Sequence, residues 1–485
     1  MSYLNEESSS SARPADVLRE LWTLGELDPV ALRWATLSGV EPVLPSSFAV
    51  ATAAQSSLAA AALAAAEIRY QRGFARQGVA VDMRHAAHEC TTYFTLNGKT
   101  LNAWDKLSGL YRCKPGGSCT WARVHANFAH HRDGFLRLIG LPEGELTERD
   151  AVEGALQGWQ AEKLEQAAAE RGLVVAAART FKQWDEHAQG RAVAASPLFS
   201  LEKIGEAPPR ELPPLSADQT PLQGLRVLEL TRIIAGPVAG RALAAYGAEV
   251  MLVNSPNLPN VGAIVETSRG KLSALVDLRK PEGKAALQDL VSGAHVFIQG
   301  YRPGGIDSLG FAPHDLARLS PGIVYVDLSA YGHDGPWADR RGFDSLVQTA
   351  TGFNLAEAQA AGAETPRALP MQILDHATGL LMAYAAQCAI LRQQREGGSW
   401  QVRLSLAHTS AWLRSLGRVP NGLQATKPTG IEDLLEKVDT GFGRLVAVRH
   451  AAKFEMTPVM WLRPSMPPGS SPARWPSTYQ DLRGS

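Results

Sequence analysis

The sequence has few cysteines, no excess of charge of either sign and no strongly apolar run of membrane-spanning length. Its 485 residues include 4 cysteines, too few for a disulfide scaffold, which is typical of a reducing compartment. Lys and Arg together number 48, as do Asp and Glu, so the chain lacks the basic excess of a nucleic-acid or anionic-membrane binder. We therefore expect a cytoplasmic protein that binds neither nucleic acid nor membrane.

Common catalytic and metal-binding motifs are also missing. The sequence contains no GxSxG, HExxH or phosphate-binding P-loop, so it offers no local signature of a serine hydrolase, a zinc protease or an NTPase. His125, His130 and His131 lie near Cys113 and Cys119 in the sequence, but no CxxC or HxxxH spacing organises them. We therefore expect no metal site.

The chain divides into regions of different composition. Residues 49–68 are mostly alanine, which transfers only weakly into lipid, so this stretch predicts a buried helix and not a membrane span. Prolines are dense between residues 206 and 221, which predicts a linker. We divide the rest into an N-terminal region (1–130), a small domain (131–205), a larger domain (222–412) and a C-terminal tail (413–485).

The larger domain alternates between apolar strands and helices. Apolar runs predict strands at 225–230, 249–253, 295–299 and 322–328, and helices are predicted at 237–246 and 281–290. Continuous apolar strands separated by helices are typical of a parallel sheet covered on both faces. We therefore expect an α/β protein with a Rossmann-like parallel sheet and a smaller α+β domain, and a ligand site beyond the carboxyl ends of the strands.

One internal repeat is visible. Residues 66–86 resemble residues 389–409 without gaps, at a constant spacing of 323 residues. The matched polar pairs include Arg69 with Arg392, Gln71 with Gln394, and His85 with His408. Any alanine-rich helix followed by a strand aligns to some extent, but polar matches in register favour a true duplication of a helix–turn–strand unit.

Four collinear segments resemble the family III CoA-transferases, the formyl-CoA transferase and carnitine–CoA transferase family (CaiB/BaiF). These segments are residues 224–256, 269–311, 328–352 and 374–398. Residues 152–199 resemble the family's small domain, and the first 200 residues resemble its post-catalytic half, so the halves stand in rearranged order. The resemblance implies the family fold, either as an interlocked homodimer or as one chain whose two halves pack together as a pseudo-dimer.

Asp375 matches the position of the family's catalytic carboxylate. There the carboxylate attacks an acyl-CoA thioester, forms a mixed anhydride and then an aspartyl-CoA thioester, from which an incoming acid collects the CoA. We expect Asp375 to be ionised at neutral pH and exposed at the N-terminus of a helix beginning near Ala377, where backbone N–H groups hold an oxyanion. The alternative is an ordinary N-cap aspartate. In the first copy of the repeat Thr52 stands at this position, so we expect one active site.

The resemblance also implies a set of CoA-binding residues. They are Thr231, Arg232, Ala235, Gly236 and Pro237 in one loop, Lys271, and Tyr301 with Arg302 in a second loop. A loop of small residues before a helix N-terminus is suited to phosphate. A solvent-facing Arg232 and a surface Lys271 are the alternatives, and Ser255 and Ser308 are neutral where the family often has a basic residue.

The function that the resemblance implies is transfer of CoA from an acyl-CoA to a carboxylic acid. CoA and acyl-CoA are then substrates, with no permanently bound cofactor, and donor and acceptor stay open. The alternative is a non-catalytic acyl-CoA-binding protein or partner subunit. An α-methylacyl-CoA racemase, also in the family, fits less well because Phe343 stands where that reaction needs a histidine to move a proton.

Overall fold

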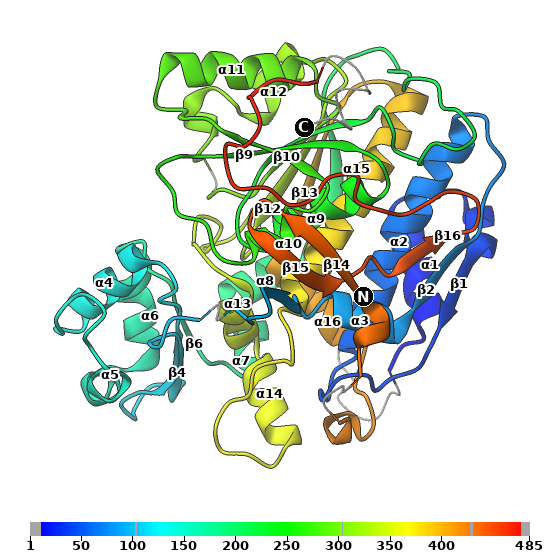
Figure 1. Cartoon of the computed structure of the whole chain (residues 1–485). Coiled ribbons are helices and arrows are strands. Elements are labelled where there is room, and N and C mark those ends of the chain that lie inside the picture. The colour runs from blue at the N-terminus through cyan, green and yellow to red at the C-terminus, as the bar shows by residue number, and fades with distance from the viewer. Residues whose placement is uncertain (1–10, 102–103, 303, 427–429, 477–485) are drawn as a thin grey trace.

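A seven-stranded sheet forms the centre of the computed structural model, which describes residues 11–101, 104–302, 304–426 and 430–476 (Figure 1). In spatial order its strands are β10 (Lys271–Leu275), β9 (Glu249–Asn254), β8 (Arg226–Leu230), β11 (Val296–Gln299), β12 (Val324–Ser329), β13 (Ser399–Ser405) and β7 (Phe199–Gly205). All neighbours pair in parallel except β7, which runs antiparallel to β13. The order of the six parallel strands is that of a doubly wound sheet. The predicted Rossmann-like α/β fold is thereby confirmed.

Alternate residues of the strands face two separate cores. In β8, Val227 belongs to one apolar cluster and Leu228 to another, and both are fully buried. Helices α9 (Ala235–Ala245) and α15 (Ile373–Glu396) contribute to the first cluster, and α11 (Pro281–Ser292) and α12 (Pro313–Leu319) to the second. Burial on both faces explains why these strands are continuously apolar. The sequence missed β10, whose first residue is a lysine.

Two long helices, α2 (Val50–Gln71) and α15, pack against each other. Every residue of α2 from Val50 to Arg69 is buried, which confirms the predicted buried helix. Its many alanines have only a methyl side chain, so the backbones of α2 and α15 can approach each other closely. In the described ranges of the chain, no helix has the length and apolar character needed to span a membrane.

The sequence repeat is visible in the structure. The first copy consists of α2, β2 (Val79–Asp82) and α3 (Met83–Glu89), and the second of α15, β13 and α16 (Leu406–Ser415). Both pairs of helices begin 323 residues apart. The caps match as well, because Asp82 accepts a hydrogen bond from the His85 N–H and Ser405 accepts one from the His408 N–H. These shared features support a duplication.

A small unit with its own core lies beside the body (Figure 1). Its strands are β4 (Gly109–Arg112), β5 (Trp121–Val124) and β6 (Val175–Ala177), and its helices are α4 (Ala129–Leu138), α5 (Arg149–Leu156) and α6 (Ala161–Glu170). Its core extends from Leu107 to Ala177, so the unit begins well before residue 131, where the sequence places it. The strands β4 and β5 have only four residues each, too few for a clear alternating pattern. Residues 199–205, which the sequence division places in the small domain, form β7 of the main sheet.

The C-terminal tail pairs with strands from the N-terminal region. Strands β14 (Leu435–Thr440) and β15 (Gly443–Val448) form a sheet with β3 (Phe94–Leu96), and β16 (Ala452–Phe454) joins β2, which also pairs in parallel with β1 (Ala35–Ser38). The predicted linker, residues 206–221, contains neither helix nor strand. The remaining helices are α1 (Pro14–Leu24), α7 (Phe181–Glu186), α8 (Ala188–Ala194), α10 (Ile264–Thr267), α13 (Asp344–Thr351) and α14 (Phe353–Ala360).

Candidate active site

Asp375 is the third residue of α15, and the helix begins at Ile373, four residues before the predicted start near Ala377. The N-cap residue is Gln372, which makes no side-chain capping bond, so Asp375 is not an ordinary N-cap aspartate. Only 7% of its surface is exposed. The predicted exposure is therefore wrong, because the apolar residues before Asp375 continue into the helix and draw its first turn into the core.

A second carboxylate holds the backbone of Asp375. Asp344, the first residue of α13, is fully buried, and its Oδ2 accepts a hydrogen bond of 2.9 Å from the Asp375 N–H. Gln348 donates to its other oxygen. The N–H of Asp375 is thus already occupied, so it is not available for the oxyanion that the sequence placed there.

Burial changes the protonation of both carboxylates. It raises the pKa of Asp344 to about 7, although the hydrogen bonds from Asp375 and Gln348 and the charge of Arg123 act in the opposite direction. Burial and the neighbouring Asp344 together raise the pKa of Asp375 well above its ordinary value. The direction of this shift differs from the expectation of a carboxylate with its ordinary pKa. Because the two groups interact, each affects the titration of the other.

The small unit contributes side chains next to α13, because its strands β5 and β6 contact this helix. Arg123 and His125 come from β5 and the residue that follows its end, and Arg123 is 8% exposed. The His125 ring stacks on Phe343, the residue before Asp344, with ring centroids 4.0 Å apart and planes at 16°. Burial lowers the pKa of His125 to about 3, so this ring is neutral at neutral pH. The junction between the small unit and α13 therefore lies beside the carboxylate pair.

The predicted CoA loop lies between β8 and α9. The Thr231 hydroxyl donates to Glu229 at 2.6 Å, and the Asn254 amide donates to the Thr231 carbonyl at 3.3 Å. At Gly236 a Cβ would lie 2.4 Å from the Thr231 side chain, so only glycine fits there. Gly379, one turn after Asp375, faces the Ala235 carbonyl, which a Cβ would approach to 2.3 Å. The contact between α9 and α15 brings this loop next to the helix that carries Asp375.

Two of the predicted CoA residues meet at the edge of the sheet. Arg232 follows β8 and Tyr301 follows β11, and these neighbouring strands flank the point where the strand order reverses. Burial lowers the pKa of Arg232 while Tyr301 raises it, so the two groups interact. Arg232 is half-buried, with its guanidinium 5.3 Å from the Phe128 ring centroid, and does not simply face solvent. Arg302 is exposed.

Lys271 occupies a different place from the one predicted. Its ammonium group is fully buried, forms an ion pair of 2.7 Å with Glu229 and donates to the Pro237 carbonyl at 2.7 Å. A buried lysine with these partners does not reach a phosphate in the cleft, and it is not a surface lysine either. It links the predicted CoA loop to α9, because Glu229 also accepts a hydrogen bond from Thr231 and Pro237 is the third residue of α9.

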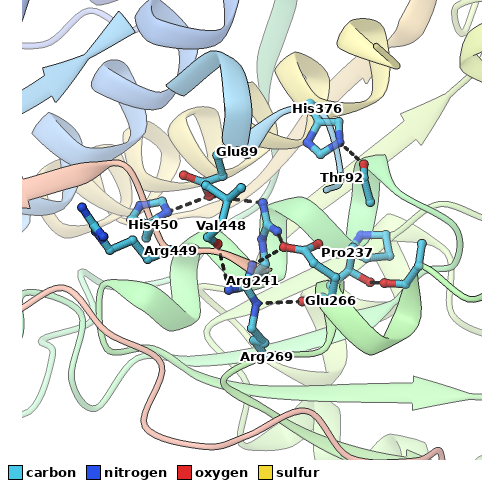
Figure 2. Close-up of polar contacts among 12 residues, drawn as sticks. Glu89, Thr92, Pro237, Arg241, Glu266, Arg269, His376, Val448, Arg449 and His450 are labelled. Atoms are coloured by element: carbon cyan, nitrogen blue, oxygen red, sulfur yellow. Dashed lines mark hydrogen bonds and ion pairs between the residues drawn. The ribbon is translucent and has the colours of Figure 1, made fainter. Parts of the chain in front are cut away.

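The first copy of the repeat reaches the start of α15 through Thr92. His376 is fully buried, and its Nε2 lies 2.6 Å from the Thr92 hydroxyl (Figure 2). Burial lowers the pKa of His376 to about 3. Figure 2 also shows the nearby buried ion pairs that join Glu89 of α3 to Arg241 of α9, and Arg241 to Glu266 of α10. Residues far apart in the sequence thus meet around the start of α15.

A cavity of about 430 Å³ lies elsewhere, near the C-terminal ends of α2 and α15. Its lining includes Gln71 and Gln394, which are equivalent in the repeat, and none of the predicted site residues. Within the described part of the chain, no group of three His, Cys, Asp or Glu side chains is placed to hold a metal ion.

Sequence reasoning missed Asp344 and Arg123. An acidic first residue of a helix is ordinarily interpreted as a partner of the helix dipole, and a lone arginine in a short strand carries no motif. Their association with Asp375 depends on contacts between segments that are distant in the sequence.

Comparison with known proteins identifies the main domain. Residues 222–429 match the model of CoA-transferase family III. An acyl-CoA transferase from Gibberella moniliformis is 32% identical over 346 residues, 65% of this chain and 60% of the relative. A succinate–glutarate CoA-transferase from Agrobacterium fabrum is 32% identical over 205 residues, 38% of this chain and 51% of the relative.

A crystal structure of a Mycobacterium tuberculosis protein shares 32% identity over 41% of this chain and 57% of that one, with a TM-score of 0.38, too low to compare the whole folds. The chain spans between half and three fifths of the length of these relatives. The segment that matches the family model contains the parallel strands β8 to β13, the CoA loop and Asp375. Residues 222–429, which hold these features, are therefore the part of the chain that is similar to CoA-transferase family III.

Proposed function

We propose that the protein moves CoA from an acyl-CoA to a carboxylic acid, with Asp375 as the nucleophile. The observation that carries this proposal is the buried pair of Asp375 and Asp344 at the start of α15, next to the loop that opens α9. A carboxylate with a raised pKa is more basic, and so a better nucleophile, than one in water. The names of the fungal acyl-CoA transferase and the bacterial succinate–glutarate CoA-transferase support the same reaction class.

The reaction proceeds through two covalent states of Asp375. Its carboxylate attacks the thioester carbonyl, the carbon–sulfur bond breaks, and a mixed anhydride and CoA thiolate form. The thiolate then attacks the aspartyl carbonyl, so that the donor leaves as a carboxylate and an aspartyl-CoA thioester remains. An incoming carboxylate repeats these steps in reverse, which yields the new acyl-CoA and free Asp375.

The residues around Asp375 have distinct roles in this scheme. Asp344 fixes the first turn of α15 by accepting the Asp375 N–H. The N–H groups of Ala235 and Gly236, at the start of α9, have no acceptor among the described residues. They are the donors we assign to the developing oxyanion, since the N–H of Asp375 is occupied.

We place CoA along the edge of the sheet where β8 and β11 end. Arg232 and Arg302 supply positive charge for the phosphates, and Tyr301 supplies an aromatic face for the adenine. Because Asp375 is only 7% exposed, we infer that the small unit moves away from α13 when the thioester enters.

We propose further that one chain forms a pseudo-dimer with one active site. The helices α2 and α15 pack together within the chain, and the C-terminal strands complete sheets begun in the N-terminal region. The first copy carries Thr52 at the position equivalent to Asp375, and a threonine hydroxyl does not form the anhydride. The rearranged order of the two family halves is consistent with this arrangement.

Mass spectrometry of the intact protein tests the proposal. Incubation with acetyl-CoA should add an acyl or CoA mass, and peptide mapping after hydroxylamine treatment should place a hydroxamate on Asp375. The Asp375→Asn variant, which keeps the size of the side chain, should show no adduct. Tight CoA binding without any adduct in the unmodified protein would contradict an enzyme. It would favour the non-catalytic CoA-binding alternative, for which the neutral Ser255 and Ser308 are the supporting observation.

A further inference from the structure

Arg123 is a buried arginine without a hydrogen-bonding partner. It is 8% exposed, and no described residue accepts a hydrogen bond from its guanidinium or forms an ion pair with it. Its Nε is completely enclosed, and the guanidinium carbon lies 5.4 Å from the Trp104 ring centroid. Burial lowers the pKa of Arg123 to about 10, so it remains charged at neutral pH. An unpaired buried charge is costly to keep, which indicates that a partner is missing.

The fold directs Arg123 toward the catalytic pair. It lies on β5, the middle strand of the small sheet, where Ala122 and Val124 face the core of the small unit. Since side chains alternate along a strand, Arg123 lies on the opposite face. The strands β5 and β6 contact α13, whose first residue is Asp344. The charge of Arg123 acts on the pKa of Asp344, which places the two groups close together.

Asp344 accepts no hydrogen bond from the Arg123 guanidinium. Its oxygens accept hydrogen bonds from the Asp375 N–H and from Gln348, and its pKa of about 7 makes it only partly charged at neutral pH. A guanidinium has five N–H donors in a planar fork that matches one carboxylate in two hydrogen bonds. His125, the nearest basic ring on the same face, is neutral because burial lowers its pKa to about 3. Arg123 is thus a charged group at the junction that no described carboxylate pairs with.

We propose that Arg123 binds a second carboxylate on the substrate, at the end away from the reacting carbonyl. The preferred acids are then dicarboxylic acids, and this inference rests on the CoA-transferase activity proposed above. A carboxylate suits the position better than a CoA phosphate does, because Arg123 is enclosed beside Asp344 while the CoA loops lie at the ends of β8 and β11.

The test compares two acids of equal length, glutarate and pentanoate, as acceptors of CoA from acetyl-CoA. In the unmodified protein, kcat/KM should favour glutarate. Arg123→Met should lower kcat/KM for glutarate by about 10- to 100-fold, the usual effect of losing a hydrogen-bonded charge. Because Arg123 also lowers the pKa of Asp344, each variant is measured at its own pH optimum, and kcat/KM for pentanoate should fall much less than that for glutarate. Arg123→Lys keeps the charge but loses the planar fork, so its loss for glutarate should be smaller. Arg137→Met, an exposed arginine of the same unit, is the matched control and should change neither value.

The half-reaction with acetyl-CoA separates this inference from the proposed function. Acetyl-CoA has no second carboxylate, so the Asp375 adduct should still form in Arg123→Met when each protein is measured at its own pH optimum. Absence of the adduct in the unmodified protein would overturn the proposed function itself. If the adduct forms but Arg123→Met affects both acids equally, Arg123 has only a structural role. If it raises the KM for acetyl-CoA instead, Arg123 binds a CoA phosphate. Either result would overturn the dicarboxylate inference.

Discussion

The two copies of the repeat begin their long helices in the same way but differ at one side chain. The third residue of α15 is Asp375, whose N–H donates to Asp344 at 2.9 Å. The third residue of α2 is Thr52, whose N–H donates to Glu41 at 2.8 Å. In both copies burial raises the pKa of the accepting carboxylate. A buried carboxylate that accepts the N–H of the third helix residue is therefore common to both helix starts, while only the second copy carries a carboxylate, the nucleophile we propose, at that third position.

The surroundings of the two helix starts also differ. The chain between β12 and α15 contains α13 and α14, which bring Asp344 and Phe343 against the small unit. The connection between β1 and α2 is short, contains no helix and supplies Glu41 directly. The second helix start thus faces a junction between two units, where we propose that the substrate binds. At the first helix start, Phe48 instead packs on Phe181 of α7 and Phe353 of α14.

The largest effect is expected when Asp375 of the second copy is replaced by threonine, the residue that the first copy has at the equivalent position 52. Asp375→Thr should lower the rate of CoA transfer by at least about 10⁴-fold, as expected when an enzyme loses its nucleophile, and should abolish the covalent adduct. The free energy of unfolding should stay constant or rise, because the variant removes one of two buried carboxylates that repel each other. Transfer rates and denaturant unfolding measure the two effects. Residual transfer well above about one part in 10⁴ of the original rate would assign the nucleophile to another residue.

The converse change adds a carboxylate to the first copy. Thr52→Asp places an acid beside Glu41 at a position that is 1% exposed, and it should destabilise the protein by about 3 kcal/mol at pH 8. In the folded state both acids should have raised pKa values, so the unfolded chain loses its protons first as the pH rises. The destabilisation should therefore be smaller at pH 5 than at pH 8, which denaturant unfolding at both pH values measures. No second adduct should form, because the junction where we propose that the substrate binds lies at the second helix start, and a second adduct would contradict that difference.

Replacing Asp344 by asparagine should shift the pH dependence of adduct formation at Asp375. Asp344 raises the pKa of Asp375 by repulsion, in addition to the effect of burial. Asp344→Asn removes that charge but keeps an oxygen for the Asp375 N–H, so the midpoint of adduct formation should move to lower pH, by about one unit for about 1.4 kcal/mol of lost repulsion. Stopped-flow adduct formation between pH 5 and 9 measures the midpoint. An unchanged midpoint would show that burial alone sets the protonation of Asp375.

The sequence predicted the scaffold better than the environment of the site. Continuous apolar runs such as that of β8 indicate a buried parallel strand directly, and the register of the repeat follows from polar matches such as His85 with His408. Asp375 was found because motifs surround it. The sequence does not predict its burial, because the expected helix start near Ala377 leaves the apolar residues before Asp375 outside α15. The burial of Lys271 and the position of Arg123 depend on packing between distant segments, which no local pattern reports.

The smallest expected effect concerns the contact that the first copy makes with the nucleophile helix. Thr92, half-buried after α3, bonds the ring of His376, the residue next to Asp375. Thr92→Val keeps the shape but leaves Nε2 of a fully buried ring without a partner, which should cost about 1–2 kcal/mol of unfolding free energy. Thr92→Ser keeps the hydroxyl and serves as the control, with a smaller loss. If the contact also positions Asp375, Thr92→Val should lower kcat several-fold while the KM for the acyl-CoA stays constant. Equal stability of the valine and serine variants would show that the two copies are joined through the buried ion pairs around Arg241 and not through this hydrogen bond.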